Sequence, residues 1–114
     1  MPVVSIQTNQ NLNADTLSEL MTRASRTVAE ILAKPERYVM VSVARNDAML
    51  FAQSDAPLAY LELKSISLPE ESTRDLSQAL CRLVHELLAI DTDRIYIEFT
   101  NAPRHMWGWN GGTF

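Results

Sequence analysis

Cysteine, histidine and glycine are scarce in this chain of 114 residues. Cys81 is the only cysteine, which excludes an intrachain disulfide, and with only His85 and His105 besides, no set of soft ligands forms a zinc site. All three glycines, at positions 108, 111 and 112, fall within the last seven residues, so P-loop and dinucleotide-binding fingerprints are absent. We therefore expect a protein that uses no metal and no cofactor.

An excess of positive charge and long apolar runs are missing as well. Ten Lys and Arg against fourteen Asp and Glu give a net charge of −4 at pH 7. This argues against nucleic acid as a partner, because the chain lacks the positive electrostatic potential that attracts phosphates. No stretch approaches the ~18 apolar residues that a membrane span needs, and the first residues lack the basic and apolar regions of a leader. We expect a soluble, cytoplasmic chain; non-classical secretion, which needs no leader, stays open.

Apolar residues make up 46% of the chain and charged residues 21%, proportions typical of one folded domain, here spanning residues 1–114. Two periodicities alternate along the sequence. Alternating apolar residues predict strands at Val3–Thr8, Tyr38–Val43, Ala59–Lys64 and Ile95–Thr100. Apolar residues at helical spacing predict two amphipathic helices, one from a capping box at Thr16–Glu19 to the stop at Lys34–Pro35, the other from Pro69 to Leu88.

The two halves of the chain resemble one another. Residues 28–33 and 84–89 share four of six identities, and each segment closes a predicted helix just before a strand. This repeat predicts an α/β (α+β) fold of two pseudo-repeated βαβ units, with a four-stranded mixed sheet and both helices on one face. Every tyrosine then lies on the uncovered face. That face carries Tyr38, Met40, Tyr60, Glu62, Lys64, Tyr96 and Glu98. Because sheets with parallel pairs are normally covered on both faces, we expect a homo-oligomer.

Several separated segments together resemble a known family. They are Met1-Pro2 and the strand ending Gln7-Thr8-Asn9, Ala33–Val41, Leu63–Ile66, Cys81, Asp93–Ile97, Gly108–Asn110 and Thr113-Phe114. Over essentially the whole chain they are similar to the macrophage migration inhibitory factor branch of the tautomerase superfamily. The resemblance implies a homotrimer with active sites at subunit interfaces and keto–enol tautomerisation of phenylpyruvate-like, or dopachrome-like, acids. It equally leaves open a non-catalytic, cytokine-like protein that binds a receptor and carries a vestigial pocket.

The resemblance also assigns site residues. With Met1 removed, Pro2 would present a free amine, which titrates near 8 and serves as a general base once its pKa falls. Lys34 would lower that pKa and hold the substrate carboxylate, and the backbone N–H of Ile66 would bind another substrate oxygen. The other substrate-binding positions implied are Tyr38, Lys64, Tyr96, Glu98, Trp107 and Trp109, with Tyr96 supplied by a neighbouring subunit. Glu98 and Trp107 depart from the animal proteins, which carry Asn and a small aliphatic residue there.

Plainer interpretations exist for two of these residues. Proline often follows an initiator methionine simply because that methionine is then cleaved. Lys34 follows a predicted helix, and its role could be no more than a favourable contact with the negative end of that helix's dipole. The resemblance, rather than the local pattern, favours catalytic roles for Pro2 and Lys34.

Overall fold

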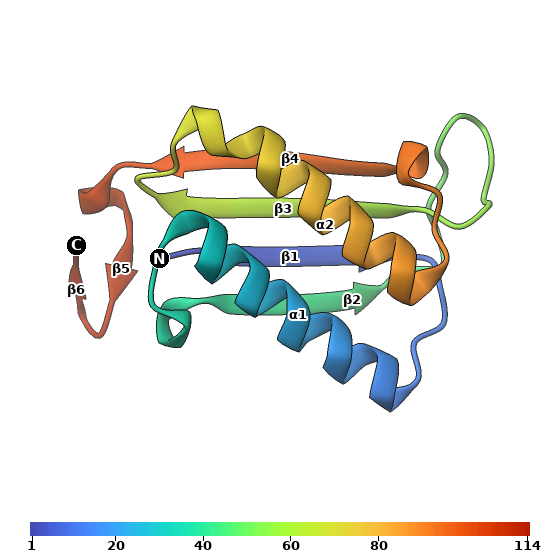
Figure 1. Ribbon diagram of the computed structural model, residues 1–114, viewed down its shortest axis with the longest axis horizontal. Coiled ribbons are helices and arrows are strands. Elements are labelled where there is room, and N and C mark those ends of the chain that lie inside the picture. Colours follow the sequence, from blue (N-terminus) through green and yellow to red (C-terminus); the bar gives the residue numbers. More distant parts are fainter.

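The computed structural model describes residues 1–114, with two long helices and a four-stranded sheet as its main elements (Figure 1). The strands of the sheet are β1 (Val3–Thr8), β2 (Met40–Arg45), β3 (Ala59–Ile66) and β4 (Ile95–Ala102). The helices are α1 (Ala14–Leu32) and α2 (Thr73–Leu88). Short 3-10 turns, η1 (Glu36–Tyr38), η2 (Glu70–Ser72), η3 (Thr92–Arg94) and η4 (Arg104–Met106), connect these elements, and β5 (Gly108–Trp109) and β6 (Gly112–Thr113) form a terminal hairpin.

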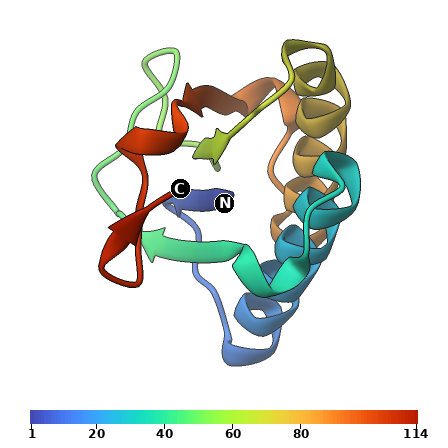
Figure 2. The ribbon, with the colours of Figure 1, turned by 90° about the vertical axis from the view of Figure 1, so that its left-hand side faces the viewer.

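The sheet has the strand order β2-β1-β3-β4. β1 runs parallel to β2 and antiparallel to β3, and β3 runs parallel to β4, so each parallel pair belongs to one βαβ unit. Both helices lie against the same face of the sheet (Figure 2). The predicted mixed sheet, the two βαβ units and the placement of both helices are thus confirmed.

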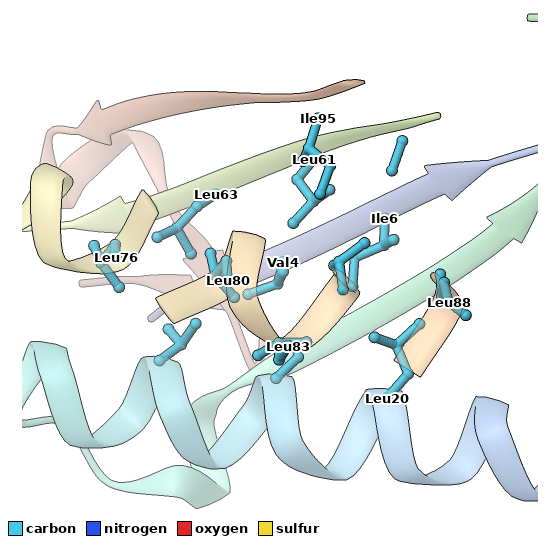
Figure 3. Close-up of a cluster of buried hydrophobic side chains, with 14 of the residues drawn as sticks. Val4, Ile6, Leu20, Leu61, Leu63, Leu76, Leu80, Leu83, Leu88 and Ile95 are labelled. Carbon is cyan, nitrogen blue, oxygen red and sulfur yellow. The ribbon is translucent and has the colours of Figure 1, made fainter. Parts of the chain in front are cut away.

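The core lies between the sheet and the two helices (Figure 3). Val4 and Ile6 of β1 and Leu61 of β3 are fully buried, because alternate residues of a strand point to one face. They meet fully buried leucines from the helices, among them Leu20 and Leu80. Each such side chain contributes roughly 1.5–3 kcal/mol of transfer free energy, which is the main term holding the helices on the sheet.

The ends of the first helix differ in one respect from the sequence prediction. The side chain of Asn13, not that of Thr16, caps α1, and its oxygen accepts a 2.8 Å hydrogen bond from the backbone N–H of Thr16. The helix therefore starts at Ala14. Its end agrees with the predicted stop, since Ala33 takes a left-handed conformation with φ of 53° and the backbone N–H of Lys34 returns to the carbonyl of Ala29 at 2.9 Å.

Two further predictions need correction. Tyr38 belongs to η1 and not to a strand, because the chain turns once after Pro35 and β2 begins only at Met40. Its assignment to the open face by strand alternation was therefore wrong. Pro69 heads η2, a single turn that leads directly into α2 at Thr73, so the second α-helix starts later than predicted.

The face of the sheet opposite the helices is uncovered in the single chain (Figure 2). Met40 and Tyr96 are 63% and 65% exposed there. Across β3 and β4, Tyr60 pairs with Tyr96 and Glu62 with Glu98, so aromatic and acidic side chains alternate along this surface. No helix combines the length and apolar character required to cross a membrane.

Candidate active site

A cavity of about 240 Å³ opens where β1 begins, between η1 and the terminal hairpin. Three segments that are distant in sequence form it: Met1–Val3, Arg37–Met40 and Trp107–Trp109. The N-terminus and the hairpin lie at the same end of the molecule, and the two chain ends lie side by side (Figures 1 and 2). The cavity thus brings together Pro2, Tyr38, Trp107 and Trp109, four of the residues predicted for the site.

Pro2 is held in place by the sheet. Its side chain is fully buried, and its carbonyl accepts a 3.0 Å hydrogen bond from the backbone N–H of Met40, which extends the pairing of β1 with β2 by one residue. While Met1 is attached, the Pro2 nitrogen is an amide without a basic lone pair. Met1 itself lines the cavity, so removing it would free both the nitrogen and the space beside it.

Lys34 reaches this end of the sheet from the loop after α1. Its Nζ donates a hydrogen bond to the backbone carbonyl of Ile66, the last residue of β3, 32 positions away in sequence. The structure therefore brings together Lys34 and Ile66, both predicted for the site. The chain-terminal amine on Met1 lies close enough to Lys34 to interact with its charge. Partial burial first, and then the charge and hydrogen bonding of Lys34, lower the pKa of that amine from 8.0 to about 6.

An aromatic column runs from one wall of the cavity, at Tyr38 and Trp109, to Phe114 outside the lining. The guanidinium of Arg37 lies 4.7 Å from the centre of the Tyr38 ring, and Tyr38 meets Trp109 edge-on at 5.9 Å. Trp109 in turn stacks on Phe114 at 5.6 Å. Such contacts are worth roughly 0.5–1.5 kcal/mol each beyond burial, so they hold the terminal hairpin against η1.

Two members of that column were not among the predicted site residues. Phe114 belongs to a segment that carried the family resemblance, so that segment was the available signal. Arg37 lies in Ala33–Val41, which also carried the resemblance, but an arginine beside a tyrosine in a connecting segment has no characteristic spacing that would single it out.

Five predicted residues are not among those that line the cavity of the single chain: Lys34 and Ile66, which meet each other near it, and Lys64, Tyr96 and Glu98. Lys64 stands opposite Val3 in the sheet but projects from the open face, where its Nζ lies 3.3 Å from a carboxylate oxygen of Glu62. Tyr96 of β4 stands beside Tyr60 of β3, which stands beside Gln7 of β1. Gln7 is five residues from Pro2 along the strand, a separation of roughly 16 Å. One chain alone therefore does not bring Tyr96 to Pro2.

Glu98 is also on the open face and already has a partner there. Its carboxylate accepts a 2.8 Å hydrogen bond from the Tyr60 hydroxyl. This bond, with smaller contributions from desolvation and from the charge of Glu62, raises the pKa of Tyr60 to about 12. Glu98 thus lies on the same face of β4 as Tyr96, two residues further along the strand, as predicted. It lies away from the Pro2 cavity of its own chain.

Comparison with known proteins places these features in a family. The family model described as macrophage migration inhibitory factor (MIF) matches residues 1–114. A macrophage migration inhibitory factor homolog from Brugia malayi is 36% identical over 115 residues, covering 100% of this chain and 99% of its own. The macrophage migration inhibitory factor of Mus musculus is 30% identical over 115 residues, with 100% and 99% covered. The crystal structure of a homologue from Prochlorococcus marinus superposes with a TM-score of 0.92 at 40% identity, covering 98% of each chain.

Proposed function

The chain belongs to the macrophage migration inhibitory factor family and has its tautomerase-like fold, and from this premise we propose that it is a keto–enol tautomerase of phenylpyruvate-like and dopachrome-like acids. One observation carries the proposal. The chain begins beside Lys34, and partial burial together with the charge of Lys34 lowers the pKa of the terminal amine that Met1 carries; we expect the same two influences to lower the pKa of the Pro2 amine once Met1 is removed, so that it can accept a proton near pH 7. The amine lies at an aromatic-walled cavity large enough for a small acid.

The base in this proposal is the nitrogen of Pro2 after Met1 has been removed. The neutral amine takes a proton from the carbon next to the substrate's keto group. The electron pair of that C–H bond forms the carbon–carbon double bond, and the carbonyl electrons move to the oxygen, which is protonated to give the enol. The reverse sequence ketonises an enol, and atoms balance in both directions because tautomers differ only in the position of one proton.

Lys34 has two roles in the proposed reaction. Its charge favours the neutral form of the amine, and it attracts the substrate carboxylate, while the nearby backbone N–H of Ile66 binds a further substrate oxygen. Tyr38, Trp107 and Trp109 enclose the apolar part of the substrate. These steps require only groups of the protein and the substrate.

We also propose that the working unit is a homotrimer in which a neighbour supplies Tyr96 and Glu98 to each site. Two observations support an oligomer: the open face exposes Tyr96 and Met40, and both outer strands of the sheet, β2 and β4, have an unpaired edge. Light scattering at micromolar concentration tests this assembly. We expect three times the chain mass of 12.8 kDa, and a monomer would rule out any site shared between subunits.

The activity is tested on protein of measured intact mass with phenylpyruvate and a dopachrome ester as substrates. We expect turnover only where Met1 is absent. Pro2→Ala keeps a primary amine and loses the rigid secondary one, so kcat should fall strongly while the circular dichroism spectrum is unchanged. Pro69→Ala, an exposed proline at the start of η2, is the matched control and should keep full activity.

Full activity in protein that retains Met1 would refute the Pro2 mechanism. No turnover by fully processed protein would instead favour the alternative function, a binding protein that acts on a receptor without catalysis.

A further inference from the structure

Arg37 is the one residue with a charged side chain among the ten that line the Pro2 cavity. It lies in η1, three positions after Lys34, on the far side of Pro35. Its side chain is exposed, and no carboxylate of the chain lies within 4.0 Å of it. Several arginines of the chain lack a carboxylate partner, but Arg37 is the one that lines the cavity, where its charge is open to a negatively charged ligand.

The orientation of Arg37 suits it to bind a planar anion. Its guanidinium lies over the Tyr38 ring at 4.7 Å, and Tyr38 is itself held by Trp109. The contact with the ring holds the guanidinium in place, and none of its N–H groups makes a hydrogen bond within the chain. Those N–H groups form a fork that matches a carboxylate or a similar oxyanion through two parallel hydrogen bonds.

Lys34 and Arg37 are held by different parts of the structure. Lys34 Nζ is already held at the Ile66 carbonyl, next to the chain-terminal amine. Arg37 is held instead by the aromatic wall, whose rings enclose the body of a substrate in the proposed function. A substrate whose 2-oxo carboxylate meets Lys34 therefore extends along the aromatic wall toward Arg37.

We propose that Arg37 is a specificity-determining residue that selects 2-oxo acids carrying a second anionic group at the end remote from the 2-oxo carboxylate. This inference rests on the proposed function, because that function places the first carboxylate at Lys34. The preferred substrate is then a dianion, and phenylpyruvate is a substrate that leaves Arg37 unused.

Binding tests the proposal independently of catalysis. The chain has two tryptophans, and both line the cavity, so intrinsic fluorescence reports on ligands there. The probes are 3-phenylpropionate and 3-(4-carboxyphenyl)propionate, titrated at low ionic strength into processed protein. Parallel kinetics use phenylpyruvate and 4-carboxyphenylpyruvate.

We expect the dicarboxylate to bind roughly five- to tenfold more tightly than the monocarboxylate, as for an accessible but preorganised ion pair. Arg37→Gln should abolish this preference and leave the Kd of the monocarboxylate unchanged. Arg37→Lys keeps the charge without the fork and should keep only part of the preference. Arg26→Gln removes an equal charge from the exposed side of α1 and should leave the preference intact.

Equal affinity of the wild-type protein for the two probes would overturn the proposal. An equal loss of affinity for both probes in Arg37→Gln would also overturn it, because the contact with Tyr38 would then have only a structural role. So would loss of the preference in Arg26→Gln, because the preference would then be a general effect of charge. If neither keto acid is turned over while the Arg37-dependent preference in binding persists, the proposed tautomerase activity fails and the anion selectivity stands.

Discussion

Replacing Lys34 with methionine removes the cation beside the chain-terminal amine while preserving a long side chain. In the structure that amine has a pKa of about 6, lowered from 8.0 by partial burial and by Lys34. Without Lys34 the burial remains, so the pKa should rise toward 8.0 and stop short of it. The same direction holds for the Pro2 amine of processed protein, which lies at the same end of β1.

The size of the effect depends on pH. The Met1 amine sets the scale for the Pro2 amine: with a pKa of about 6 it is roughly nine-tenths neutral at pH 7, whereas an amine with the ordinary pKa of 8.0 is roughly one-tenth neutral. The base-dependent part of kcat/KM should therefore fall by up to about tenfold at pH 7 in Lys34→Met. At pH 9 both amines are mostly neutral and this part of the loss should largely disappear. Weaker binding of the carboxylate, in contrast, should persist at every pH.

The measurement is the pH profile of kcat/KM for phenylpyruvate between pH 5 and 9. Wild type and Lys34→Arg, which keeps the charge, should rise with the same midpoint, below the ordinary 8.0 of a terminal amine, and Lys34→Met should rise at higher pH and to a lower plateau. Profiles of wild type and Lys34→Met that differ only by a constant factor would refute the reasoning, because Lys34 would then bind substrate without tuning the base.

Three further changes test other parts of the structure. Glu98→Asn should lower the pKa of Tyr60 from about 12 toward 10.0, so that phenolate absorbance appears at lower pH, and an unchanged Tyr60 titration would contradict this. The same change should raise kcat/KM for phenylpyruvate by about tenfold at low salt if Glu98 of a neighbouring subunit faces the site. Arg94→Ala removes four hydrogen bonds to loop carbonyls and should lower the free energy of unfolding by about 2–4 kcal/mol in urea, with unchanged stability as the contrary result. Leu80→Ala should cost about 2–5 kcal/mol because the side chain is fully buried, and Leu50→Ala, 72% exposed, should cost less than about 0.5 kcal/mol; equal losses would contradict the described core.

The layers of the fold could be predicted because their signals are local. Val4 and Ile6 alternate with Ser5 and Gln7, and the leucines of α2 recur at helical spacing, so each element reveals which side it buries. The repeat of residues 28–33 at 84–89 then orders the elements into two equivalent units. Both copies end in the same way, at Ala33 and Ala89 in the left-handed conformation, with φ of 53° and 54°.

The errors arose where two local signals compete. Asn13 and Thr16 are both good N-cap residues, and the choice depends on how far α1 can extend before its apolar stripe leaves the core. Tyr38 fits a strand pattern with Val39 and Met40, yet one 3-10 turn after Pro35 interrupts it. In each case the local pattern allowed both choices, and the folded structure contains one of them.

The site is a matter of long-range contact. The chain alone established a proline at position 2, a lysine where the first helix stops, and aromatic residues near its end. That Lys34 meets Ile66, or that Arg37, Tyr38, Trp109 and Phe114 form one column against Pro2, depends on how the sheet and hairpin bring distant segments together. Periodicity reports the side of an element that is buried, since it reflects backbone geometry over a few residues. The partner across the sheet is selected by the cooperative packing of all the elements, and no short stretch of sequence encodes it.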